Sequence, residues 1–144
     1  MFPATGDRPG TPEDILPDDI EFVIGAANAK VRAGKLDDAI RMYMFLAELG
    51  PFNYRVLQGL TNCLLMRGLF VQALPFATLM VDLQPRNPHG YYFSGLACWS
   101  SGHHREAIED FEIVLHLKDE VKDLSILTEC EMLLRHLRKD TGTA

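Results

Sequence analysis

The residues best equipped for chemistry in this sequence are a group of histidines with a glutamate. His103, His104 and Glu106 are side chains of the kind that ligate metal ions. Neighbouring residues at the start of a helix point in diverging directions, so these three do not converge on one ion. His89 stands apart from this group and is interpreted as a surface or satisfied residue. We therefore expect no metal site and no cofactor.

The three cysteines, Cys63, Cys98 and Cys130, form an odd set without close spacing, and the sequence has no C-x-x-C pair. This favours buried, reduced thiols over a disulfide framework, because a catalytic cysteine also needs a neighbouring base. Phosphate-binding glycine loops, G-x-S-x-G and H-E-x-x-H are absent from the sequence. The acidic pairs at 37–38 and 109–110 are interpreted as solvated helix faces. The sequence predicts no catalytic residues and a protein that is not an enzyme.

Charge and hydropathy exclude two classes of partner. The formal net charge of −6 argues against nucleic acid, because phosphate binding needs a basic surface. No window approaches 18 uninterrupted apolar residues, and the first ten residues lack a basic region followed by an apolar stretch. We therefore expect no direct membrane insertion and a cytoplasmic location.

A 34-residue period organises the chain. Three glycines lie 34 residues apart and each is followed five residues later by an alanine: Gly34, Gly68 and Gly102, then Ala39, Ala73 and Ala107. The same spacing relates three small residues, Ala27, Thr61 and Gly95, and three potential N-caps, Asp19, Asn53 and Asn87. Glycine permits the left-handed backbone that ends a helix, and small residues let two helices approach closely. The period therefore predicts three helix hairpins, with helices over 20–32, 36–49, 54–66, 70–83, 88–100 and 104–117.

This period and these residue types resemble the tetratricopeptide repeat (TPR), over about residues 19–120. The fold class expected is an all-α TPR solenoid with three helix-turn-helix repeats at 19–52, 53–86 and 87–120. Two positions depart from the repeat pattern: Asp119 replaces a proline and Ala77 replaces an aromatic residue. Pro75 also lies inside a predicted helix, where proline removes a hydrogen bond or bends the chain.

The two ends of the chain differ from the repeats. Residues 121–138 continue an amphipathic pattern, with Leu124, Leu127, Cys130, Leu134 and Leu137 on one stripe, and are predicted to form a capping helix over the last repeat. Residues 1–18 are rich in proline and acids, which predicts a flexible arm.

Stacked TPR hairpins curve, and the first helix of each repeat lines the concave surface. The residues expected to form a peptide-binding groove there are Ile24, Asn28, Val31, Arg55, Gln58, Asn62, Leu65, Met66, Tyr92, Phe93, Leu96 and Trp99. Amides suit this role because they both donate to and accept from an extended peptide backbone. Leu65, Leu96 and Trp99 could instead pack between neighbouring repeats.

Within the repeat class, the stretches YRVLQGLTNCLLMRGLFVQAL and YYFSGLACWSSGHHREA resemble the class II chaperones of bacterial type III secretion. That resemblance implies an ATP-independent chaperone whose groove holds an extended segment of a secreted translocator protein. Members of that family often dimerise through a longer helical arm, so a homodimer stays open. A needle-subunit cochaperone or another secretion-associated TPR protein stays open as an alternative.

A TPR groove has two other known uses. TPR proteins that grip the acidic tails of heat-shock chaperones need Lys, Arg and Asn in the groove. Only Asn28 matches that pattern, because Ile24, Gly59, His89 and Phe93 occupy the other places. The remaining alternative is a TPR adaptor or scaffold that assembles proteins without a chaperone role.

Overall fold

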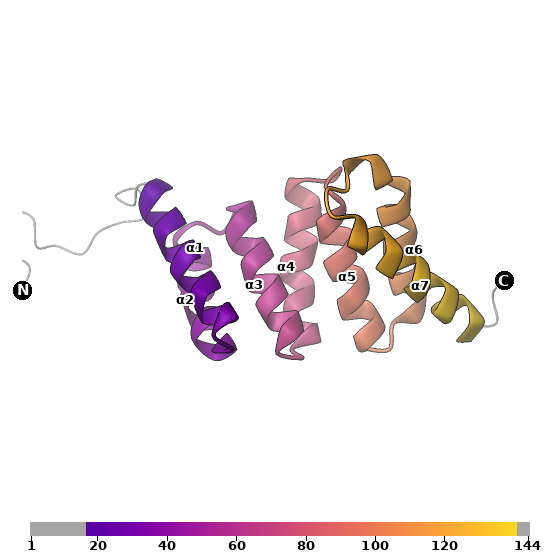
Figure 1. The fold of residues 1–144 in the computed structure, drawn as a ribbon, viewed down its shortest axis with the longest axis horizontal. Helices are drawn as coiled ribbons and strands as arrows, with labels where there is room; N and C mark the ends of the chain where they lie inside the picture. The colour runs from indigo at the N-terminus through magenta and orange to yellow at the C-terminus, as the bar shows by residue number, and fades with distance from the viewer. Residues whose placement is uncertain (1–16, 141–144) are drawn as a thin grey trace, which may run out of the picture.

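The computed structural model describes residues 17–140, and these are helical throughout apart from short turns. The elements are α1 (Pro17–Arg32), α2 (Leu36–Leu49), α3 (Tyr54–Met66), α4 (Phe70–Leu83), α5 (Pro88–Ser100), α6 (His104–His116), the 3-10 helix η2 (Lys118–Glu120) and α7 (Leu124–Asp140). Consecutive helices pack as antiparallel hairpins that stack along one axis (Figure 1). The predicted all-α TPR solenoid is confirmed.

The periodic glycines end the first helix of each hairpin. Gly34, Gly68 and Gly102 have φ of +77°, +80° and +84°, in the left-handed region where a side chain would be strained. After each one, the next amide nitrogen donates to a carbonyl five residues back, as in Lys35 N to Lys30 O at 2.9 Å. This is the Schellman arrangement, which satisfies carbonyl groups at the helix end. One recurrent glycine therefore sets every hairpin turn.

The predicted caps hold at two of three positions. The Asn53 side chain accepts a hydrogen bond from Val56 N at 3.2 Å, and the Asn87 side chain accepts from His89 N at 3.1 Å. The prediction for Asp19 was wrong, because α1 begins at Pro17 and Asp19 lies in its first turn. Proline suits the first helical position, and a carboxylate in the first turn interacts favourably with the helix dipole.

The core runs from one end of the solenoid to the other in three overlapping clusters of buried side chains. The first joins α1 to α4, the second joins α3 to α5, and the third joins α5 to α7. The small residues of the repeat, Ala27, Thr61 and Gly95, are all buried. An ideal Cβ on Gly95 would lie 2.5 Å from the Phe111 ring, so the close approach of α5 and α6 requires glycine there.

At each junction between two repeats an aromatic ring packs against a small residue, but the helix that carries the ring differs between the two junctions. Between the first two repeats, Tyr43 of α2 packs over Gly59 of α3, and a Cβ on Gly59 would lie 2.3 Å from Tyr43 Cζ. One period later the pair is Ala77 of α4 and Phe93 of α5, which share a core cluster. The ring comes from the second helix of a repeat (α2) at one junction and from the first helix of a repeat (α5) at the next. This exchange explains why Ala77 departs from the repeat pattern.

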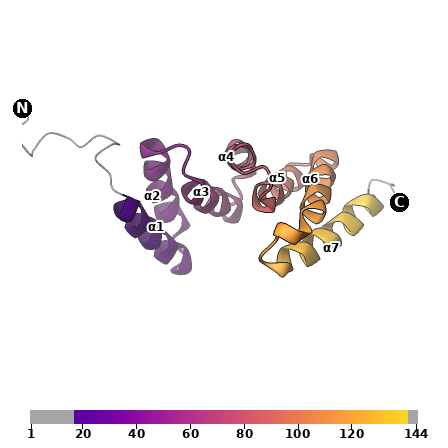
Figure 2. The same ribbon diagram turned by 90° about the horizontal axis from the view of Figure 1, so that it is seen from above.

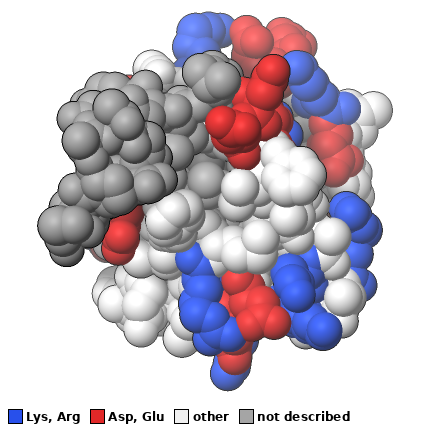
Figure 3. All heavy atoms as spheres, turned by 90° about the vertical axis from the view of Figure 1, so that its left-hand side faces the viewer, with Lys and Arg blue, Asp and Glu red and all other residues white. Residues whose placement is uncertain are grey.

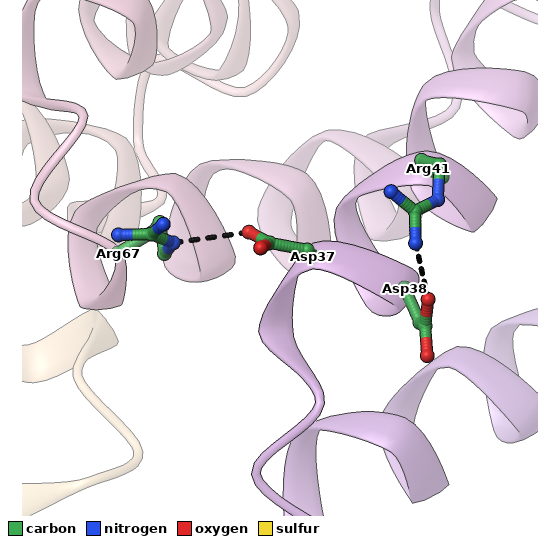
Figure 4. A network of polar contacts seen from close by, with 4 residues as sticks. All are labelled: Asp37, Asp38, Arg41 and Arg67. Atoms are coloured by element: carbon green, nitrogen blue, oxygen red, sulfur yellow. Dashed lines mark hydrogen bonds and ion pairs between the residues drawn. The ribbon is translucent and has the colours of Figure 1, made fainter.

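The other irregular positions are accommodated locally. Helix α4 continues through Pro75, which is exposed, and η2 occupies the place where Asp119 replaces proline. Ion pairs tie neighbouring repeats together at the surface. Figure 4 shows Asp37 at the start of α2 bound to Arg67 after α3, with Arg67 Nε 3.0 Å from Asp37 Oδ1. The same view shows Arg41 paired with Asp38 within α2.

The two ends of the chain refine the predicted boundaries. The predicted arm at 1–18 falls outside the described residues, except that residues 17 and 18 belong to α1. The capping segment, predicted at 121–138, forms α7 and packs against α6. Its buried face consists of Ile126, Cys130, Leu134 and Leu137, whereas Leu124, predicted on the stripe, is exposed. Seen from above, α1 and α7 lie on the same side of the molecule (Figure 2).

Candidate peptide-binding groove

A cavity of about 390 Å³ lies between the first helices of the three repeats, α1, α3 and α5, and the start of α7. Its lining residues are Ile24, Asn28, Tyr43, Arg55, Gln58, Gly59, Asn62, His89, Tyr92, Phe93, Asp123, Ser125, Ile126 and Glu129. Helices α1, α3 and α5 supply residues one turn apart, because positions spaced by three or four share a helix face. The start of α7 supplies the remaining wall. We call this space the groove cavity.

The structure brings seven of the predicted groove residues together here. They are Ile24 and Asn28 from α1, Arg55, Gln58 and Asn62 from α3, and Tyr92 and Phe93 from α5. Asn28 and Asn62 occupy equivalent positions one period apart, so the periodicity indicated that these turns of α1 and α3 line the same space.

Five predicted residues do not line the groove cavity: Val31, Leu65, Met66, Leu96 and Trp99. Val31, Leu65, Met66 and Trp99 lie in the last turns of α1, α3 and α5, whereas Leu96 lies one period after Asn62. Val31, Leu65, Leu96 and Trp99 are partly buried against the core clusters, while Met66 is exposed. For Leu65, Leu96 and Trp99 the structure favours the alternative of packing between helices. Large apolar side chains near a helix crossing are drawn into the core more strongly than into an open surface.

Sequence reasoning missed the wall formed by Asp123, Ser125, Ile126 and Glu129. A repeat period predicts which residues of the repeated helices share a face. It does not predict the angle at which α7, which lies outside the repeats, crosses the groove. Three further lining residues were also left out. Tyr43 belongs to α2, a second helix of a repeat, whereas only first helices were expected to line the groove. Gly59 has no side chain, and His89 was interpreted as a surface or satisfied residue. The cap at Asn87 places His89 in the first turn of α5, and this was the signal that the sequence offered for its position.

Fixed hydrogen bonds hold the polar side chains of the groove cavity. The Tyr43 hydroxyl donates to Asn28 Oδ1, and the Tyr92 hydroxyl donates to Glu129 Oε2 at 2.7 Å, which joins α5 to α7. The His89 ring meets Phe93 edge-on, with ring centroids 4.8 Å apart. Interlocked aromatic rings lose little conformational freedom on binding a ligand, so this wall is preorganised.

The charged side chains of the cavity leave it with a small net negative charge. Arg55 is already paired with Glu21, one period upstream. Burial lowers the pKa of His89, although nearby Asp123 opposes the shift, so the imidazole is neutral at pH 7. The pKa of Asp123 is held low by its hydrogen bonds from Ser125, so this side chain is a carboxylate. A neutral or amphipathic ligand therefore fits better than an acidic one.

The groove cavity combines polar groups with an apolar floor. Its polar groups are amides, hydroxyls, carboxylates, the Arg55 guanidinium and the His89 imidazole, around the apolar floor of Ile24, Phe93 and Ile126. The thiols lie in the core, where burial raises the pKa of Cys63 to about 11 and that of Cys130 to about 12. Within residues 17–140, no three His, Cys, Asp or Glu side chains are grouped so that they could hold a metal ion.

The groove cavity continues into a second one of about 610 Å³ near the turns before α5 and α7. The two share Gln58, His89, Asp123 and Ile126. In the second cavity Arg86 is paired with Glu120 at 3.4 Å, across one period of the repeat. An extended segment several residues long could therefore pass from one cavity to the other.

Comparison with known proteins places the fold. No protein-family model matches the sequence. Mouse serine/threonine-protein phosphatase 5 is 28% identical over 144 residues, which cover 94% of this chain and 29% of the mouse protein. The chain thus spans less than a third of that relative's length. None of the helices between residues 17 and 140 has the length and apolarity to cross a membrane.

Two solved structures illustrate the similarity. The type III secretion chaperone SycD of Yersinia enterocolitica, in complex with a peptide of the translocator YopD, has a TM-score of 0.81 at 19% identity, covering 89% of this chain and 98% of SycD. The first TPR of Spaghetti (RPAP3), bound to the HSP90 peptide SRMEEVD, has a TM-score of 0.77 at 21% identity, covering 90% and 98%. The chain therefore has the TPR fold, and its fold resembles that of the type III secretion translocator chaperones.

Proposed function

We propose that this protein is an ATP-independent chaperone that holds an extended segment of a type III secretion translocator, or of a related exported protein, in the groove cavity. Binding lowers the free concentration of an aggregation-prone region of the client and so protects it until hand-off. The protein acts in the bacterial cytoplasm, binds a protein client and catalyses no reaction.

The observation that carries this proposal is the composition of the groove cavity. Apolar and aromatic side chains form its floor, and Asn28, Gln58 and Asn62 supply amides at its edge. Apolar pockets receive the side chains of an extended peptide, and amides pair with its backbone. This is the chemistry needed to hold an apolar segment in an extended conformation.

The same cavity disfavours the acidic tail peptide that the Spaghetti domain binds. The resemblance to tail-binding TPR domains requires Lys, Arg and Asn at the positions of the groove, and Ile24, Gly59, His89 and Phe93 occupy all of them here except that of Asn28. Arg55 is the one Lys or Arg among the lining residues, and it is paired with Glu21. Asp123 and Glu129 would repel an acidic ligand. The SycD complex with a translocator peptide is therefore the better guide to the ligand.

The test compares two labelled peptides and two protein variants by fluorescence anisotropy. The peptides are the YopD segment bound by SycD and SRMEEVD. The site variant combines Asn62→Ala with Tyr92→Ala, and the control combines Gln72→Ala with Thr78→Ala on the exposed side of α4. We expect the YopD peptide to bind, SRMEEVD not to bind, and the site variant alone to weaken binding by about 10-fold or more.

Capture from the encoding bacterium then identifies the natural client. An exported amphipathic protein retained by the unaltered chain and lost from the site variant supports the proposal. Protection of that client from aggregation without ATP supports the chaperone role. Equal capture of partners by both chains would refute the assignment of the groove, and capture without any effect on aggregation would identify the protein as an adaptor.

A further inference from the structure

A second, separate cavity lies between α5 and α7 at the C-terminal end of the solenoid. It has a volume of about 460 Å³ and is lined by Trp99, Met132, Leu133, Arg135, His136 and Lys139. It shares no residue with the groove cavity or its extension. We call it the C-terminal cup.

The floor of the C-terminal cup is apolar and open to solvent. Met132 is 59% exposed, and Trp99, the only tryptophan in the sequence, is partly buried beside α7. Tryptophan and methionine give large contact areas at protein interfaces, and methionine adapts to different partners. The cup therefore offers a site for one or two aliphatic side chains.

The rim of the cup is basic in a chain whose net charge is −6. Met132, Arg135, His136 and Lys139 are spaced by three and four residues and so share one face of α7. Within residues 17–140, neither Arg135 nor Lys139 belongs to any of the ion pairs, whereas His136 Nε2 lies 3.2 Å from Asp140 Oδ2. Lys139 complements the helix dipole from the last turn of α7, but Arg135 lies outside that turn and is not explained in this way.

We propose that the C-terminal cup binds the segment Glu13-Asp14-Ile15-Leu16 of a second copy of this chain. The segment carries two adjacent aliphatic side chains for the apolar floor. Acids flank them on both sides, because Asp18 and Asp19 follow at the start of α1. Four carboxylates thus face a basic rim, and opposite charges around an apolar centre fix register as well as partner.

The geometry requires the segment to come from another copy. Leu16 is bonded to Pro17, the first residue of α1, and four extended residues reach at most ~14 Å. The start of α1 and the C-terminal half of α7 lie at opposite ends of the solenoid (Figure 1). A chain therefore cannot place this segment in its own cup.

A competing surface exists at the other end of the molecule. Large apolar side chains are exposed on α1, on α2 and just after α2, namely Phe22, Phe45 and Phe52. Figure 3 looks onto this end and shows an uncharged area bordered by basic and acidic side chains. It carries no distinct excess of positive charge to match an acidic segment, so the cup is the better fit for residues 13–16.

The contact is small, because four residues bury far less than the area of a stable interface. We expect a dissociation constant on the order of 100 µM, so association is visible only in concentrated solution. Sedimentation equilibrium of the full chain from about 10 µM to 1 mM measures it. The variant with Arg135→Glu and Lys139→Glu should lose association about 10-fold or more, as should the variant with Glu13→Lys and Asp14→Lys.

The decisive measurement mixes these two variants. Their charges complement each other, so the mixture should associate although neither does alone. The control carries Arg105→Glu and Lys118→Glu, which change the net charge equally at exposed positions outside the cup, and it should behave as the unaltered chain. Circular dichroism confirms that each variant is folded.

A covalent readout is independent of affinity. Chains with Leu16→Cys and chains with Met132→Cys should form a mixed disulfide on mild oxidation, more than 10-fold faster than Leu16→Cys with Ile113→Cys. A chain that stays monomeric to 1 mM, association unchanged by the charge reversals, or equal disulfide rates would overturn the proposal. Unchanged association would instead implicate the end formed by α1 and α2.

Discussion

Asp110 shows how a single partly buried side chain contributes to the pH dependence of stability. It lies in α6 and accepts a hydrogen bond from Ser94 Oγ at 2.7 Å. Burial, reinforced by the charges of Glu109 and Glu106, raises its pKa from 3.8 to about 6, and the bond from Ser94 opposes the shift. The folded state therefore prefers the protonated form more than the unfolded state does.

The sign of this effect gives a prediction. Below pH 3.8 Asp110 is protonated in both states, and as the pH rises to about 6 the unfolded state ionises first, so folding loses free energy. Asp110→Asn keeps an acceptor for Ser94 and does not ionise. Allowing for solvent screening, we expect it to stabilise the protein by roughly 1 kcal/mol at pH 7.5 and by almost nothing at pH 4.

Thermal unfolding at the two pH values measures this difference, as a shift in Tm of about 4 °C at pH 7.5. Asp82→Asn, at an exposed position near the end of α4, is the control and should show no such change between the two pH values. A difference in Tm between Asp110→Asn and the unaltered chain that is equal at both pH values would contradict the explanation by a partly desolvated carboxyl group.

Gly59 and Gly25 provide a matched pair one period apart. An added Cβ on Gly59 would meet the buried ring of Tyr43, whereas a Cβ on Gly25 meets nothing within 4 Å. Gly59→Ala should therefore destabilise the fold by roughly 1–3 kcal/mol through overpacking. Gly25→Ala should stabilise it by roughly 0.5–1 kcal/mol, because alanine loses less entropy in a helix. Urea unfolding gives both values, and the same sign for both variants would refute the Tyr43 contact.

At the scale of the elements, each repeat junction contains a ring on one helix and a small residue opposite it on the next helix. The two residues of such a pair should therefore be energetically coupled. Ala77→Tyr should overpack its junction, and Phe93→Gly should leave a cavity that costs roughly 3–5 kcal/mol. The double variant reproduces the arrangement of Tyr43 and Gly59. Its cost should fall below the sum of the single costs by about 1 kcal/mol or more. A double-mutant cycle in urea measures the coupling, and additive costs would show that the ring cannot move between helices.

Most of the helices were predictable because each has residues that mark its start or its end. Glycine at a left-handed turn and asparagine at a cap are local signals, so α2 to α5 have the predicted bounds. The start of α1 was misplaced because two neighbouring acids, Asp18 and Asp19, suit both a cap and a first turn. The aromatic exchange could not be read from either position alone, because a ring and its empty partner site lie on different helices.

At the scale of the whole molecule, each repeat contacts only its neighbours, so the ends of the solenoid are stabilised from one side. Helix α1 packs on α2 and α3, whereas α3 has neighbours on both sides. We expect amides of α1 to exchange with deuterium at least ~10-fold faster than those of α3. Hydrogen exchange with mass spectrometry measures this, and equal protection of the two helices would show that the solenoid opens only as one unit.

The candidate site was predictable in part for the same reason. Residues of α1, α3 and α5 repeat with the period, so Asn28, Asn62 and Tyr92 could be placed on a common face. The wall from α7 depends on how a last helix lies across earlier ones, and that arrangement follows from tertiary packing of Ile126 and Cys130 against α6. Packing of this kind leaves no local spacing to recognise.

The position of that wall has a consequence for synthesis of the chain. Because the groove cavity needs residues from Ile24 to Glu129, a ribosome must make nearly the whole solenoid before the site exists. The three repeats can begin to pack while translation continues, but a nascent chain that ends before α7 lacks one side of its binding site. The groove cavity is therefore complete only after translation has passed residue 129, so a ligand that needs all of its walls cannot bind a shorter nascent chain.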